Sequence, residues 1–182
     1  MFQVSPFILL SLSRVIMLSP SSPAPYHFIQ LERSRRYLQR LRDIYAGVFN
    51  DGNTKQTYED DVLSFFMHCY HVRDWLIHAE VAPVQAKKVD EFISGSSCLK
   101  LCADICNGVK HCKLTKPPRS GCQPDLSGKE YKSSFWLSGS SGGELLQARY
   151  TIHTATGPVD ALDLAENCVQ SWSDFIAETC RE

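Results

Sequence analysis

The stretch that best reveals the fold is residues 98–111, "CLKLCADICNGVKH". Helical steps of about 100° per residue separate its apolar side chains from its polar ones. The apolar face comprises Cys98, Leu101, Cys102, Ile105, Cys106, Val109 and, just beyond the stretch, Cys112. The polar, outward face comprises Lys100, Asp104, Asn107 and His111, with Lys110 at its edge. This pattern predicts an amphipathic helix whose apolar side packs against other helices.

Similar periodicity predicts four more helices, at residues 26–49, 57–79, 84–94 and 159–180. The connections are short: "NDGN" at 50–53, Pro83, and "SGSS" at 94–97, which offers a serine N-cap to the next helix. "KPPRSGCQP" at 116–124 ends the helix that begins at Cys98, because proline cannot continue a helix. The sequence therefore predicts a mainly α protein, an antiparallel helical bundle of four to five helices.

The apolar period changes to two before the last helix. "SSFWLS" at 133–138 and "ELLQARYTIHT" at 144–154 have the composition and alternation of strands, and "SGSSGG" at 138–143 can link them as a flexible loop. We predict a β-hairpin insert at about 131–157, before the C-terminal helix. Residues 26–182 then form a single domain, and residues 1–25 form a flexible or loosely packed N-terminal extension.

Composition and charge narrow the function classes. The chain has 182 residues, 43% hydrophobic and 21% charged, which is ordinary for a globular protein. A net charge of −1 argues against nucleic-acid binding over the whole surface but leaves room for a local basic patch. The first helix carries such a patch: Arg33, Arg35, Arg36, Arg40 and Arg42. Because Arg14 and Pro6 interrupt the apolar N-terminal run, we expect no membrane association.

Eight cysteines raise the question of metal or thiol chemistry. In the helix at 98–111 the cysteines lie among leucine and isoleucine, where a reduced cysteine acts as a small hydrophobic residue. No pair has the C-x2-C spacing typical of structural zinc sites. We therefore expect reduced thiols in a cytoplasmic protein, with no metal and no cofactor. Two alternatives stay open: ligands from Cys102, Cys106 and His111 or from His68 and His71, and thiol or zinc chemistry at Cys102, Cys106, Cys112 and Cys122.

Two polar clusters carry the potential chemistry. Asn107 and His111 are four residues apart and so neighbours on a helix surface, where histidine can exchange protons near neutral pH. The alternative is the ordinary polar end of a helix, where cations favour the C-terminus. In "HCYHVRDWLIH" at 68–78, Arg73 lies on the apolar side and needs a carboxylate or a route to solvent. The opposite face holds His71, Trp75 and His78, either as a partner surface or packed against the same chain.

These two segments resemble the motif of the HEPN superfamily, helical bundles with an Arg-polar-x3-His segment. "RDWLIH" at 73–78 matches the whole pattern, and "CNGVKH" at 106–111 matches its Asn and His positions with Cys106 in place of arginine. The resemblance implies a homodimer that cleaves RNA without a metal, in a bacterial defence or toxin–antitoxin type system. It assigns catalysis to Asn107, Lys110 and His111 on facing helices of two subunits, or to Arg73 and His78. RNA or partner contacts would come from Lys100, Asp104, His71 and Trp75.

The second hypothesis is a non-catalytic helical adaptor that binds a cognate protein partner. The basic side of the first helix and the His71, Trp75 and His78 face would then be its contact surfaces. The absence of arginine at position 106 favours this hypothesis, because that arginine is the residue expected to contact the RNA phosphate.

Overall fold

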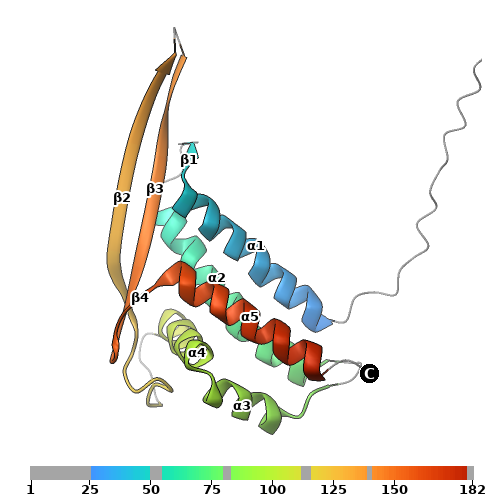
Figure 1. Ribbon diagram of the computed structural model, residues 1–182. Coiled ribbons are helices and arrows are strands. Elements are labelled where there is room, and N and C mark those ends of the chain that lie inside the picture. The colour runs from blue at the N-terminus through green and yellow to red at the C-terminus, as the bar shows by residue number, and fades with distance from the viewer. Residues whose placement is uncertain (1–25, 50–54, 80–82, 112–115, 139–140, 180–182) are drawn as a thin grey trace, which may run out of the picture.

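The computed structural model describes residues 26–49, 55–79, 83–111, 116–138 and 141–179. Residues 1–25, where we predict a flexible extension, lie outside this part of the chain. The described residues form five helices (Figure 1): α1 (Tyr26–Ala46), α2 (Lys55–Ile77), α3 (Ala86–Gly95), α4 (Ser97–Lys110) and α5 (Ala161–Thr179). The prediction of a mainly α protein is confirmed, and each helix lies within a few residues of its predicted position.

The helices pack around one apolar core. In Figure 1, α1 runs towards the sheet, whereas α2 and α5 run away from it, and α3 and α4 cover the other side of α2 and α5. The largest fully buried side chains of the helices are Trp172, Phe65, Phe66, Leu31, Leu41, Leu76, Ile93 and Leu99. Ser96 is the N-cap of α4, since its hydroxyl accepts a hydrogen bond from the amide of Leu99, as the "SGSS" segment predicts.

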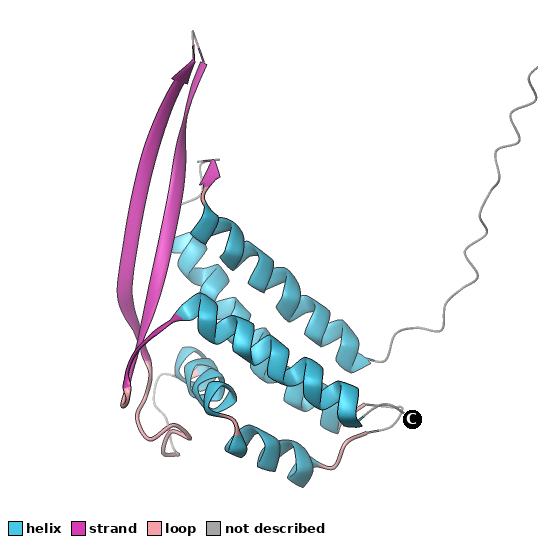
Figure 2. Cartoon of the chain, in the orientation of Figure 1, coloured by secondary structure: helices cyan, strands magenta, loops and turns pink. Residues whose placement is uncertain are grey.

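The strands form a larger sheet than the predicted hairpin. Figure 2 shows two long strands, β2 (Asp125–Ser138) and β3 (Ser141–Thr154), beside the helices. β2 pairs antiparallel with one edge of β3, and the other edge pairs with β1 (Val48–Phe49) and β4 (Gly157–Asp160). The described sheet thus has four strands, and the prediction of a hairpin alone is incomplete. Strands of two and four residues are too short to produce a periodic signal in the sequence.

A buried tyrosine fixes the sheet to the helices. β1 pairs with Leu145 and Leu146 of β3, and β4 pairs with residues 151–154, which leaves Tyr150 between them. The hydroxyl of Tyr45, on α1, donates to the carbonyl of Tyr150 at 3.1 Å and accepts from its amide at 3.0 Å. Burial raises the pKa of Tyr45 to about 12, so the hydroxyl stays protonated and keeps both bonds.

The far end of the β2–β3 hairpin extends beyond the helices, past β1 (Figure 1). Its apolar side chains are open to solvent: Phe135 is 77% exposed and Leu137 88% exposed. Trp136, 44% exposed, makes an edge contact with Phe49 of β1. Among the described residues, no helix is both long and apolar enough to cross a membrane.

Candidate functional site

A basic pocket lies between α1 and α2. Its volume is about 340 Å³, within the range of pockets that bind small ligands. It is lined by Arg33, Arg36, Tyr37, Arg40 and His68. The four α1 residues follow the spacing i, i+3, i+4, i+7, which places them along one side of the helix. A pocket lined by three guanidinium groups and no carboxylate suits a negatively charged ligand.

The arginines of the pocket differ in how far their charges are compensated. Arg40 pairs with Asp61 at 2.9 Å and its guanidinium lies 4.9 Å from the ring centre of Tyr37. Arg33 donates to the neutral side chain of Gln30 at 2.8 Å. Arg36 has neither a hydrogen bond nor an ion pair to any described residue. Among the described residues, no carboxylate therefore compensates the charge of Arg33 or Arg36.

The histidine of the pocket is held in a neutral state. His68 stacks on Tyr37 with ring centres 4.9 Å apart, and its Nδ1 lies 3.4 Å from the amide nitrogen of the buried Gln30. Because an amide nitrogen can only donate, Nδ1 accepts and the ring proton lies on Nε2. Burial, and then the charges of Arg33, His71 and Arg36, lower the pKa of His68.

One turn further along α2, a second histidine contacts a lysine of α4. Nζ of Lys110 lies 2.8 Å from Nε2 of His71. A protonated lysine can only donate, so Nε2 of His71 is the unprotonated acceptor. Burial and the charge of Lys110 lower the pKa of His71, and Asp74 opposes them. In this pair, the neutral imidazole of His71 can accept a proton, and the ammonium group of Lys110 places a positive charge beside it.

The residues of the basic pocket and of the His71–Lys110 pair come from three helices, α1, α2 and α4. We call them together the basic face: Arg33, Arg36, Arg40, His68, His71 and Lys110. Trp75 borders it, with the guanidinium of Arg33 5.8 Å from its ring centre. The other two arginines of the predicted basic patch lie elsewhere. Arg35 contacts Ser173 of α5, and Arg42 pairs with Glu166 of α5. Only part of the predicted patch therefore belongs to the basic face.

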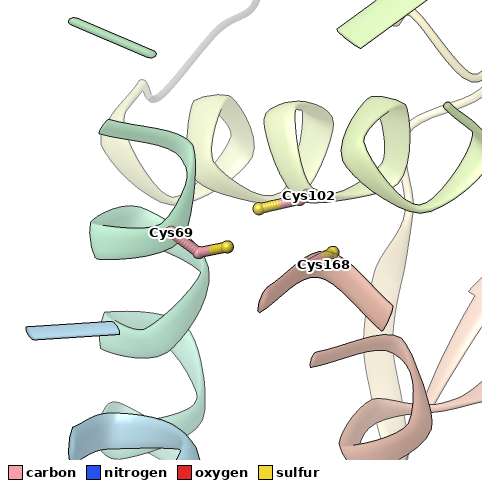
Figure 3. A group of neighbouring side chains, drawn as sticks. All are labelled: Cys69, Cys102 and Cys168. Carbon is pink, nitrogen blue, oxygen red and sulfur yellow. The ribbon is translucent and has the colours of Figure 1, made fainter. Parts of the chain in front are cut away.

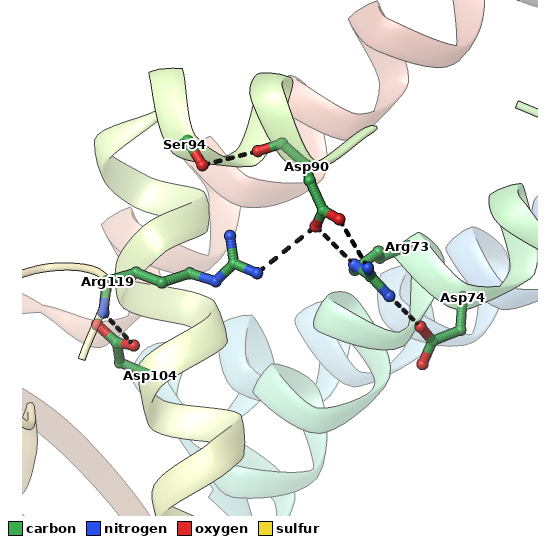
Figure 4. A network of polar contacts seen from close by, with 6 residues as sticks. All are labelled: Arg73, Asp74, Asp90, Ser94, Asp104 and Arg119. Carbon is green, nitrogen blue, oxygen red and sulfur yellow. Dashed lines mark hydrogen bonds and ion pairs between the residues drawn. The ribbon is translucent and has the colours of Figure 1, made fainter. Parts of the chain in front are cut away.

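Arg73, a residue of the HEPN-like segment, takes part in an ion-pair network shown in Figure 4. Its guanidinium donates to both carboxylate oxygens of Asp90 on α3, at 2.9 and 2.8 Å, and to Asp74 at 2.8 Å. Arg119 reaches Asp90 from the other side at 3.5 Å. Of the alternatives that were open for Arg73, namely solvent, a carboxylate or a buried site, the structure shows the carboxylate. The hydrogen bonds that Arg73 donates to Asp90 are the largest cause that raises the pKa of Arg73. The charge of Arg73 is thus compensated within the chain.

Asp104 is buried, and the prediction that it lies on an outward polar face of α4 is wrong. It is 2% exposed and accepts hydrogen bonds from the amides of Arg119 and Ser120 at 2.8 and 2.7 Å. The Ser120 hydroxyl adds a third bond, at 2.6 Å, and Gln123 donates to the Asp104 carbonyl at 3.0 Å. The segment after α4 thus folds back over this helix. It covers part of the surface on which two α4 helices were expected to meet.

The remaining predicted residues lie apart. Asn107 and Lys100 are half-buried, and His111 is exposed at the C-cap of α4. His78 is exposed just after α2. Within the described part of the chain, the side chains of Lys100, Asn107, His78 and His111 make no hydrogen bond or ion pair. Val109, predicted to be in the core, is 41% exposed because α4 ends one residue later and its last turn projects from the bundle.

No protein-family model, curated protein or solved structure matches the chain. The basic face is therefore the feature from which a function can be inferred. It includes Tyr37 on α1, which the sequence analysis does not single out. Arg36 was expected there only as part of the basic patch, and His68 only as a possible metal ligand. The i, i+3, i+4, i+7 spacing of the α1 residues indicates that they share one side of the helix. It does not indicate that α2 forms the other wall of the pocket.

Proposed function

We propose that the protein is an HEPN-like RNA-binding protein that cleaves RNA without a metal ion, as part of a bacterial defence or toxin–antitoxin type system. The observation that carries the proposal is the basic face, which joins uncompensated guanidinium groups to the His71–Lys110 pair. An RNA backbone is held mainly by cations along its phosphates. Trp75, half-buried beside Arg33, adds an aromatic side chain on which an unpaired base can stack.

The pair can carry out the first half of RNA cleavage. The ribose 2′-hydroxyl replaces Lys110 at Nε2 of His71, and this nitrogen takes the hydroxyl proton as the oxygen attacks the neighbouring phosphorus. The released ammonium of Lys110 then stabilises the additional negative charge on the phosphate. The lowered pKa of His71 keeps its imidazole neutral and ready to accept a proton.

The second half needs a proton donor for the leaving oxygen. We assign this role to His111, which is exposed and follows Lys110 in the chain. The bond between phosphorus and the 5′-oxygen breaks as that oxygen takes the proton, leaving a cyclic phosphate and a free hydroxyl. Arg33 and Arg36 hold flanking phosphates. The basic pocket therefore binds the RNA, and the His71–Lys110 pair acts in its cleavage.

The test is cleavage of labelled single-stranded RNA with EDTA present. We compare the wild type with His71→Ala, Lys110→Ala and His111→Ala, and use His153→Ala, an exposed histidine of β3, as the matched control. Loss of one proton-transfer group should lower the cleavage rate by about 100-fold or more. Equal rates in the wild type and His71→Ala, or no cleavage by the wild type at high concentration, would refute the catalytic assignment.

A non-catalytic adaptor is the second candidate, favoured by the compensated charge of Arg73 and the exposed apolar tip of the hairpin. A measurement of RNA binding distinguishes the RNA-cleaving protein from the adaptor. The proposed function expects affinity that falls with salt and with Arg36→Gln, because Arg36 has no partner within the described chain. A folded protein without measurable affinity for RNA supports the adaptor.

A further inference from the structure

Three cysteine thiols converge in the core. Cys69 comes from α2, Cys102 from α4 and Cys168 from α5, and their sulfur atoms all lie within 4.8 Å of one another. Figure 3 shows the three side chains pointing into the same space between the helices. Each residue is fully buried. Helices far apart in the sequence thus bring together ligands that suit a soft metal ion.

A fourth thiol lies at the edge of this group. Cys98 is one turn before Cys102 on α4, and its sulfur is not one of the three that lie within 4.8 Å of one another. The Cys168 thiol contacts the carbonyl oxygen of Cys98 at 3.4 Å. Cys98 is only half-buried, so the group reaches from the core towards solvent on this side.

Hydrogen-bond donors surround the sulfur of Cys98. Hydroxyl groups of Ser96 and Ser171 lie 3.1 and 3.4 Å from the Cys98 sulfur, which is in the first turn of the 14-residue α4. The buried indole N–H of Trp172 has no hydrogen-bond partner among the described residues.

We propose that Cys69, Cys102 and Cys168, with Cys98 as the fourth ligand, bind one zinc ion. Four thiolates in a tetrahedral arrangement form a closed structural site. Cys98 completes it by turning its side chain inward from the rim. Binding releases the thiol protons to solvent and oxidises nothing. The serine hydroxyls and the Trp172 N–H serve as outer hydrogen-bond donors to the thiolates.

Such an ion would join α2, α4 and α5, and it lies in the core, apart from the basic face. Thiolates buried this deeply need a cation beside them. A bound zinc ion supplies that cation, so its binding stabilises the folded chain. The site does not depend on the proposed function, and either can fail without the other.

The first experiment measures zinc in the full chain, purified without chelator under reducing conditions. We expect about one zinc ion per chain. Cys168→Ala should lose the zinc, whereas the matched control Cys106→Ala, a buried cysteine one turn beyond Cys102 on α4, should retain it. Removal of zinc from the wild type with a strong chelator should lower its melting temperature, and addition of zinc should restore it.

A second measurement covers the case in which Cys168→Ala fails to fold. The zinc-free wild type is titrated with Co²⁺, and the sulfur-to-cobalt charge-transfer band and the visible bands of tetrahedral cobalt are recorded. The proposal expects both, and expects zinc to displace the cobalt. It is overturned by a zinc content near zero in fully reduced wild type together with no tetrahedral cobalt spectrum, or by binding of Cu⁺ alone.

Discussion

The two histidines of the basic face make stability depend on pH. Burial and neighbouring positive charges lower the pKa values of His68 and His71 in the folded chain. Groups with a lowered pKa contribute full stability above their unfolded pKa, and this stability is lost as the pH falls through the folded pKa. We expect the free energy of unfolding to decrease from pH 7 towards acid, and the decrease to be smaller in the double variant His68→Gln/His71→Gln.

Urea unfolding at a series of pH values measures this dependence. His153→Gln is the control, since His153 is an exposed residue of β3, and it should keep the wild-type slope. The same slope in the wild type and the double variant would contradict the neutral state that we assign to both histidines.

After burial, the charge of Lys110 is the second cause that lowers the pKa of His71. Lys110→Met keeps much of the side-chain length and removes the ammonium group that lies 2.8 Å from the imidazole. We expect the pKa of His71 to rise towards its ordinary value, as observed by NMR titration of the imidazole signals. Lys100→Met, on the same helix but without contact to His71, should leave the pKa unchanged. A pKa that is the same in all three proteins would remove Lys110 as a cause.

At the scale of elements, Asp104 ties the segment after α4 to the helix. Asp104→Ala removes three hydrogen bonds to Arg119 and Ser120 and leaves two backbone amides without their acceptor. We expect a loss of about 3 kcal/mol in the free energy of unfolding. Hydrogen exchange should show faster exchange at both amides. Asp125→Ala, at the exposed start of β2, is the control and should change stability little. Protected amides in Asp104→Ala would contradict this role.

The salt bridge between α2 and α3 is a weaker tie. Arg73→Met removes the paired contacts with Asp90 but keeps much of the apolar stem. Because both side chains are partly exposed, we expect a loss of about 1 kcal/mol, most of it absent when Asp90→Asn is already present. A double-mutant cycle by chemical unfolding measures the coupling. A coupling energy near zero would mean that the ion pair does not stabilise the packing of α3.

The helices could be predicted because each has its own local signal. The apolar positions of α4 and the Ser96 cap are visible in a dozen residues of sequence. Asp104 was misplaced because its partners, Arg119 and Ser120, follow a proline turn whose path no local pattern encodes. The contact between the thiols of Cys69 and Cys102 was not predicted for the same reason. The spacing of cysteines within one helix does not indicate which thiols the neighbouring helices bring close to it.

At the scale of the molecule, a net charge of −1 coexists with a basic face because acidic residues pair with the other arginines. Glu166 forms an ion pair with Arg42, and Asp90 forms one with Arg73. Arg36 has no such partner in the described part of the chain. Composition could therefore allow a basic patch but not locate it. The β2–β3 hairpin could be predicted from the alternation of residues 144–154. Its projection beyond the bundle depends on long-range contacts that attach β3 to β1 and to Tyr45 of α1.

The projecting hairpin offers a contact for the homodimer that the HEPN resemblance implies. Within the described residues, β2 pairs only with β3, so its outer edge has free backbone groups over 14 residues. An antiparallel edge is complementary to itself, and two copies related by a two-fold axis can pair there. The exposed Phe135 and Leu137 lie on this strand and would be covered by the same contact. A second copy of the chain is therefore the partner that we propose for this surface.

We expect Phe135→Ser/Leu137→Ser to shift the protein from dimer to monomer, as measured by light scattering after size-exclusion chromatography over a range of concentrations. Because both side chains are largely exposed, the melting temperature of the monomer should change little. Val109→Ser removes an apolar residue, 41% exposed, from the end of α4 and should leave the dimer intact. A wild type that is monomeric at every concentration, or a dimer that survives the double substitution, would exclude the hairpin as the dimer contact.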